Sequence, residues 1–241
     1  MKIALISDLH LDHWKHVDVD EALKNISEEC KDAEIVFNAG DTGTAIYKVN
    51  VRDYFPNQVY LEAQGNHDYY HGTFSNDFST FEYKSWRIFV GSLWTDFNNN
   101  PLAEMMAERC INDFRLIKDC NASTMVNAFN DTKRAIREYK PHIIMTHFAP
   151  FHKSIHPKYG DTPVNYFFCN DMKSIMESQP QLRLWMHGHT HSPMDYKVGA
   201  CRVLANQLGY PRENYVNIAQ YKPQIITLTP PKFSVVEGGK E

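Results

Sequence analysis

The sequence lacks several features that would each point to a particular class of protein. Its five cysteines are scattered and form no Cys-x-x-Cys pair, which argues against a disulfide framework and a zinc ribbon. Positive charge is not in excess, since the net charge is −4, so no global basic field attracts nucleic acid. No apolar run approaches the roughly 18 residues of a membrane span, and the first run stops at Ser7, too early for a signal peptide. We therefore expect a cytoplasmic protein with reduced thiols and no membrane contact.

Repeats, low-complexity segments and obvious linkers are also missing. The chain has 241 residues, 43% of them hydrophobic and 22% charged, which is typical of a globular protein with a sizeable core. We expect one domain over residues 1–241. The count of twelve histidines is high and is a first indication of metal chemistry.

Short apolar runs and amphipathic segments predict an α/β fold. The expected strands are 3–6, 35–37, 59–63, 86–90, 142–145, 182–186, 202–205 and 225–228. The expected helices are 18–31, 101–109, 123–139 and 170–178. Residues 69–83 are polar and aromatic without a clear period, and we interpret much of 69–130 as a helical elaboration over the sheet, or a lid.

Five of the apolar runs end in residues that can bind metal ions. In chain order these are Asp8 and His10, Asp41, Asn66 and His67, His147, and finally His189 and His191. One such coincidence is usually a turn or a helix cap. Five of them at the carboxyl ends of expected strands predict a common site, because ligands converge at that edge of an α/β sheet.

The number of candidate ligands predicts two metal ions. A zinc site takes four ligands, and seven are present without counting His67: Asp8, His10, Asp41, Asn66, His147, His189 and His191. They suffice for two ions if one carboxylate bridges. Nitrogen and oxygen ligands without thiolate suit Mn, Fe, Zn, Co or Ni. Two ions about 4 Å apart form a clamp for in-line displacement at phosphorus.

These motifs, in this order, resemble the motif set of the calcineurin-like metallophosphoesterase superfamily. The segments that carry the resemblance are Asp8-x-His10, Gly40-Asp41, Gly65-Asn66-His67-Asp68, His147 and Gly188-His189-Thr190-His191. Three further segments, 92–97, 112–114 and 206–210, resemble a group of small bacterial and phage phosphoesterases in that superfamily. The resemblance implies a four-layer α/β/β/α sandwich with a dinuclear centre at the strand ends. It implies that Asp8, His10 and His191 bind one ion. Asn66, His147 and His189 would bind the other, with Asp41 bridging and manganese as the expected metal.

The resemblance also implies catalytic roles for two residues that follow Asn66. His67 would lie beside the scissile phosphate, where it stabilises phosphoryl oxygens or protonates the leaving group. Asp68 would orient His67, and the alternative interpretation of Asp68 is a turn residue. One departure from the pattern is Phe148, at a position where that group often has a second histidine. Trp94 either lines the site or belongs to the core.

Three functions follow as hypotheses. The first is a phosphoesterase in which a metal-bound hydroxide attacks a phosphomonoester or phosphodiester, with a small nucleotide-type substrate as the expected partner. The second is a nuclease of the same superfamily, which the net charge of −4 disfavours. The third is a scaffold without catalysis, disfavoured because all seven ligands and His67 are present. The sequence leaves the oligomeric state open.

Overall fold

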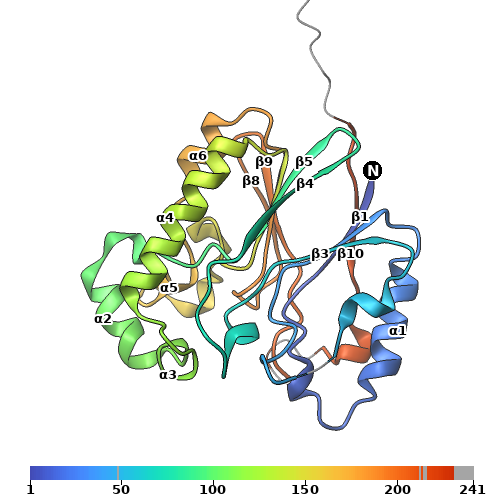
Figure 1. Cartoon of the computed structure of the whole chain (residues 1–241), viewed down its shortest axis with the longest axis horizontal. Helices are drawn as coiled ribbons and strands as arrows, with labels where there is room; N and C mark the ends of the chain where they lie inside the picture. The colour runs from blue at the N-terminus through green and yellow to red at the C-terminus, as the bar shows by residue number, and fades with distance from the viewer. Residues whose placement is uncertain (48, 212, 214–215, 231–241) are drawn as a thin grey trace, which may run out of the picture.

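The computed structural model describes residues 1–47, 49–211, 213 and 216–230. They contain two β-sheets flanked by helices (Figure 1). The strands are β1 (Lys2–Ile6), β2 (Ile35–Asn38), β3 (Val59–Glu62), β4 (Phe78–Tyr83), β5 (Trp86–Gly91), β6 (Ile143–Thr146), β7 (Leu184–His187), β8 (Met194–Val198), β9 (Cys201–Ala205) and β10 (Gln224–Thr227). The α-helices are α1 (Val19–Glu29), α2 (Pro101–Cys110), α3 (Asp113–Leu116), α4 (Ala122–Tyr139), α5 (Asn165–Phe168) and α6 (Lys173–Ser178).

The two sheets pack face to face. One has the order β10-β1-β2-β3 and the other β4-β5-β6-β7-β9-β8. In the first sheet β1, β2 and β3 are parallel, and in the second β5, β6, β7 and β9 are parallel. The carboxyl ends of the parallel strands therefore gather at one edge of each sheet, which is the edge where sites form.

Alternation along the central strands produces three apolar cores. In β1, Ile3 and Leu5 face the second sheet, while Ala4 and Ile6 pack against α1 on the opposite side. A third core lies between the second sheet and α2, α4 and α6. Helix, sheet, sheet and helix thus form four layers, and the α/β/β/α prediction is confirmed (Figure 1).

Helix ends are defined by side-chain caps. The Asp18 side chain accepts a hydrogen bond from the Glu21 N–H and starts α1. Asn100 caps α2 just before Pro101, a residue suited to the first helical position. The expected start of α4 at residue 123 is slightly late, because Asn121 forms a capping box with Thr124.

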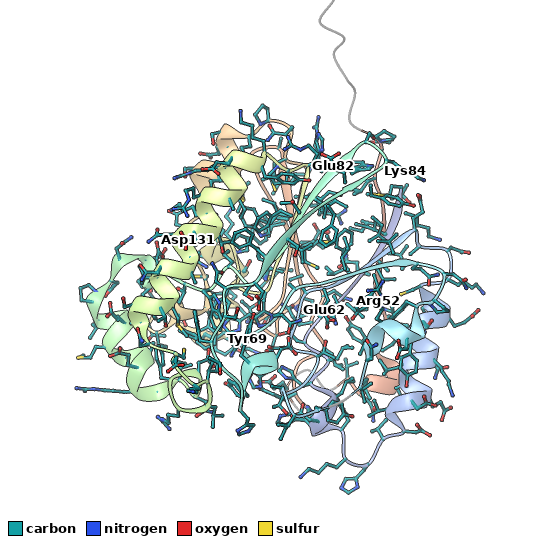
Figure 2. All side chains as sticks on the ribbon, viewed as in Figure 1. Arg52, Glu62, Tyr69, Glu82, Lys84 and Asp131 are labelled. Carbon is teal, nitrogen blue, oxygen red and sulfur yellow. The ribbon has the colours of Figure 1, made fainter. Side chains whose placement is uncertain are left out.

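The segment 69–130 contains helices, as expected, and one strand that was not expected. The helices are α2, α3 and the first part of α4, and the unexpected strand is β4. This strand pairs with β5 at the edge of the second sheet and is largely exposed, so it carries no buried apolar face that would reveal it in the sequence. Figure 2 shows the labelled Glu82 and Lys84 at the outer end of this hairpin, whereas Glu62 lies among interior side chains.

Two further differences from the expected elements concern strand β8 and helix α6. The strand β8 pairs only with β9 at the other edge of the second sheet, and the sequence analysis did not predict it. The helix expected over 170–178 is shorter and begins at Lys173. Within the described ranges, each helix is either too short or too polar to span a lipid bilayer.

Candidate metal centre

The seven expected ligands come together where β1, β2, β3, β6 and β7 end. Two groups of buried side chains have ligand atoms within 4.8 Å of one another. The first group is Asp8, His10, Asp41 and His191, and the second is Asp41, His147 and His189. The side chain of Asn66 adjoins the second group, with its Oδ1 atom 3.1 Å from His147 Nε2. The convergence inferred from strand ends is therefore present in the fold.

Asp41 belongs to both groups through a single oxygen atom. Its Oδ2 atom lies 3.7 Å from His10 Nε2 and 3.4 Å from His147 Nε2. Its Oδ1 atom accepts a hydrogen bond from the backbone N–H of His67 at 2.9 Å, which fixes the plane of the carboxylate. This is the geometry that a bridging carboxylate requires.

Hydrogen bonds behind the ligands hold them in orientation. The Nδ1 atom of His147 lies 2.7 Å from the Ala39 carbonyl oxygen, so its Nε2 atom faces Asp41. The Nδ1 atom of His191 lies 2.5 Å from Glu213 Oε2. Such outer partners set the tautomer and direction of a ligating imidazole.

Backbone geometry at the site is unusual. Five of the seven candidate ligands have positive φ angles, a region that non-glycine residues rarely adopt. They are Asp8, His10, Asp41, His189 and His191. Two glycines allow the loops to approach one another: a Cβ at Gly65 would lie 2.1 Å from Asp41 Oδ1, and one at Gly188 would lie 2.6 Å from Asp8 Oδ2. Strain of this kind is concentrated at functional sites.

The donor set fits divalent cations. The buried Nε2 atom of His189 has no hydrogen-bond partner among the described residues, although it lies within the second group. In the first group His10 Nε2 is 3.0 Å from His191 Nε2. Burial lowers the pKa of His10 and of His189, so both imidazoles are neutral and keep a lone pair for a metal.

The remaining two imidazoles carry protons in this arrangement. Burial lowers the pKa of His147, but the charge of Asp41 outweighs burial and the net pKa is about 9. Burial also lowers the pKa of His191, and hydrogen bonds to Asp8 and Glu213 bring it to about 10. A divalent cation bound between these carboxylates and imidazoles would release the protons, so metal affinity rises with pH.

His67 lies beside the ligands and lines a pocket of about 560 Å³. Its Nε2 atom is 2.8 Å from the Tyr210 hydroxyl, and its ring stacks on Tyr70 with the centroids 4.1 Å apart. Burial lowers the pKa of His67. The imidazole is thus held at the pocket surface by the two tyrosines.

Asp68 does something different from what the sequence analysis expected. Its carboxylate accepts hydrogen bonds from the backbone N–H groups of Gly65 at 2.7 Å, Asp41 at 2.9 Å and Thr42 at 3.1 Å. Among the described residues it makes no hydrogen bond with the His67 imidazole. The side chain therefore joins the loop after β2 to the loop after β3, which is closer to the alternative role of a turn residue.

Two carboxylates next to the ligands were not assigned a role from the sequence. Asp113, in α3, accepts hydrogen bonds on Oδ1 from Asn66 Nδ2 at 2.9 Å and from the Tyr70 hydroxyl at 2.8 Å. Burial raises the pKa of Asp113 to about 6. The other is Glu213, which contacts His191 from the loop after β9. A carboxylate in a loop distant in sequence gives no signal of such a contact, because only the fold brings it close.

Three further residues belong to the core. Trp94 is fully buried, and its Nε1–H donates to the Ser75 carbonyl oxygen, so it does not line the site. His187 is buried at the end of β7, with its Nε2 atom 2.8 Å from Ser154 Oγ. Phe148 packs against the His189 ring with centroids 4.1 Å apart, a packing role in place of a second histidine.

Comparison with known proteins gives a family and a fold. The profile described as calcineurin-like phosphoesterase matches residues 1–193. A comparison with curated proteins finds no match. Among solved structures, phosphopantetheinyl hydrolase from Mycobacterium tuberculosis has a similar fold, with 15% identity over 95% of this chain and 96% of that one and a TM-score of 0.68. A dimetal phosphatase from Danio rerio is 12% identical over 85% of this chain and 86% of that one, with a TM-score of 0.47.

At 15% identity, the similarity to phosphopantetheinyl hydrolase shows the fold alone. The family match is stronger, because it spans 193 of the 241 residues and includes all the strand-end motifs described above. The chain therefore belongs to the calcineurin-like phosphoesterase family and is a metallophosphoesterase, a hydrolase acting on phosphoester bonds.

Proposed function

We propose that the chain hydrolyses a small phosphomonoester or phosphodiester, of which nucleotides are one candidate class, with two divalent metal ions. The observation that carries the proposal is the Asp41 carboxylate, whose Oδ2 atom is shared by two buried ligand groups. Both groups adjoin a pocket large enough for a small ligand. Manganese is the expected metal, with Fe, Zn, Co and Ni as alternatives that the nitrogen and oxygen donors also suit.

The ligands divide into two sets in this proposal. Asp8, His10 and His191 hold one ion, and Asn66, His147 and His189 hold the other. Asp41 binds both. When bound, two such ions activate water and hold phosphoryl oxygens during in-line displacement.

His67 acts on the substrate and not on the metals. Its imidazole lines the pocket next to the ligands and is oriented by Tyr70 and Tyr210. In this position its ring N–H donates a hydrogen bond to a phosphoryl oxygen, whereas protonating the leaving oxygen would require the imidazolium form, which burial disfavours by lowering the pKa of His67. Asp68 supports it indirectly, by holding the loops that carry Asp41 and His67.

A nuclease receives less support than an enzyme for small substrates. A nuclease needs a basic groove that follows the nucleic-acid backbone. The described residues that line the pocket include no lysine or arginine. Salt-dependent binding of single-stranded DNA would favour a nuclease.

We propose a cytoplasmic location on the basis of the thiols. All five cysteines are free, and Cys30, Cys169 and Cys201 are buried. Burial raises the pKa of the Cys30 thiol to about 12, which keeps it protonated and unreactive. A chain with five unpaired thiols suits a reducing compartment.

Two variants test the proposed function by separating metal binding from turnover. His67→Ala should keep both ions but lower kcat by about 10²–10⁴-fold, the usual contribution of a positioned acid or base. Asp41→Ala should lose metal as well as activity, because its carboxylate serves both ions. The exposed residue His16 provides a matched control, and His16→Ala should change neither quantity. Equal kcat values for the wild type and His67→Ala would reject the role of His67.

A further inference from the structure

The pocket beside the metal ligands has an apolar wall. Helix α5, the end of α2 and the segment between β6 and α5 contribute it. Its residues are Ile111, Ile155, Tyr159, Val164, Phe167 and Phe168. The wall reaches the ligands directly, since the ring of Phe168 stacks on His189 with centroids 5.0 Å apart. Tyr159 is 46% exposed, so this part of the wall faces solvent when no ligand covers it.

Away from the imidazoles of the metal ligands, the described part of the pocket lining carries negative charge. The described residues of the lining include the carboxylates of Asp41, Asp113 and Glu213 and no lysine or arginine. Lys158 is near in sequence, but it is not part of the lining, and its Nζ atom lies over the Tyr159 ring, 4.9 Å from the centroid. The Lys158 charge also acts on Glu213 from outside the lining. Among the described lining residues, positive charge is therefore confined to the end of the pocket that would hold the metal ions.

These two features limit the substrate. A second phosphate or a carboxylate on the leaving group would lose its hydration in a site with apolar walls, where the described lining offers no lysine or arginine to pair with it, and this is costly. An uncharged aryl or alkyl group would instead gain by covering apolar surface. The cavity of about 560 Å³ is within the range of sites for small molecules.

We propose that the substrate carries one anionic group, the phosphoryl group that reacts, and an uncharged leaving group whose aryl or alkyl part packs on the apolar wall. This inference rests on the proposed function, because it takes the metal ligands as the phosphoryl site. Nucleoside monophosphates meet the description. Nucleoside polyphosphates and nucleic acids do not, because their additional phosphates would face Asp113 and Glu213 or the apolar side chains.

Two ester substrates of equal size test the charge limit. One is 4-carbamoylphenyl phosphate, whose leaving group is neutral, and the other is 4-carboxyphenyl phosphate, whose leaving group is anionic. With manganese-loaded enzyme we expect the neutral ester to have the higher kcat/KM by about tenfold or more, mainly through KM. Equal values, or a preference for the carboxylate, would overturn the inference while leaving the proposed function intact.

A substitution in the wall gives a sharper test. Tyr159→Lys adds a lysine to a lining whose described residues include none, at a half-exposed position that tolerates a polar side chain. Tyr159→Gln is the matched control, since it removes the same ring without adding charge. We expect both substitutions to raise KM for the neutral ester. Only Tyr159→Lys should raise kcat/KM for the anionic ester relative to kcat/KM for the neutral ester. If the ratio of the two kcat/KM values were identical in both variants, the charge argument would be contradicted.

Recognition can also be measured without turnover. The corresponding phosphonates, 4-carbamoylphenylphosphonate and 4-carboxyphenylphosphonate, cannot be hydrolysed, and calorimetry gives their affinities for the manganese-loaded protein. Tighter binding of the neutral phosphonate, with no hydrolysis of either ester, would support the inference and reject the proposed function. Failure of both phosphonates to bind would overturn the inference.

Discussion

Asp113 offers a test of how the helical segment after β5 supports the metal centre. The change is Asp113→Ala. In the wild type, one carboxylate oxygen accepts hydrogen bonds from Asn66 Nδ2 at 2.9 Å and from the Tyr70 hydroxyl at 2.8 Å, and Asp113 is fully buried. The alanine variant leaves both buried donors without an acceptor, and Asn66 loses the contact that orients its amide oxygen towards His147.

The expected magnitude follows from these contacts. Loss of an outer partner lowers metal affinity by about 10–100-fold, which corresponds to roughly 1.4–2.8 kcal/mol. The loss should affect only the ion held by Asn66, because no hydrogen bond in the described part of the chain joins Asp113 to the first group. Each unsatisfied donor also costs about 1–3 kcal/mol of folding stability.

The assay is calorimetric titration of chelator-treated protein with Mn2+. We expect the wild type to bind two ions, and Asp113→Ala to bind one with unchanged affinity and the other more weakly. Asp113→Asn retains an oxygen acceptor and should recover part of the affinity, while Asn112→Ala, a neighbour in the same lining, should resemble the wild type. Wild-type affinity for both ions in Asp113→Ala would refute the reasoning.

Three other variants test the surroundings of the site. Gly188→Ala should bind metal weakly, because the new Cβ would lie 2.6 Å from Asp8 Oδ2, and metal analysis showing a full complement would contradict this. Asp68→Ala should lower both the Tm and metal affinity, since backbone N–H groups lose their acceptor; a fall in kcat alone would indicate instead that Asp68 acts through His67. Burial raises the pKa of Glu62 in the folded state, so its stability contribution is lost as pH rises through that pKa, and Glu62→Gln should gain stability relative to the wild type in urea unfolding as pH rises above the ordinary glutamate pKa of about 4.3. A stability difference that does not change with rising pH would argue against a perturbed Glu62.

The central strands and the convergence of the candidate ligands were predictable for one physical reason, the burial of the central strands on both faces. A strand buried on two faces, such as β1 or β7, is a continuous apolar run, and the first polar residues after it lie at the sheet edge. Edge strands lack this signature. In β4, Phe78 and Phe81 are 40% and 39% exposed, and the segment therefore has no buried face in the sequence pattern.

The residues that contact the candidate ligands and His67 are brought there by the tertiary fold, and their roles were only partly predictable. Asp113 stands in a segment whose resemblance to small phosphoesterases was visible, but its contact with Asn66 requires α3 to be folded under the loop after β3. Tyr210 reaches His67 across 143 positions of sequence. The family resemblance implied that Asp68 orients His67, whereas the loop geometry turns the Asp68 carboxylate to the backbone of the loop after β2.

The most direct test of a dinuclear phosphoesterase is a titration of activity with metal. Chelator-stripped protein is supplied with Mn2+ in increasing equivalents, and hydrolysis of an aryl phosphomonoester and an aryl phosphodiester is followed at each step. The account predicts no turnover without metal and a rise that reaches its plateau at two equivalents per chain. Turnover that needs no metal, or a plateau at one equivalent, would contradict it.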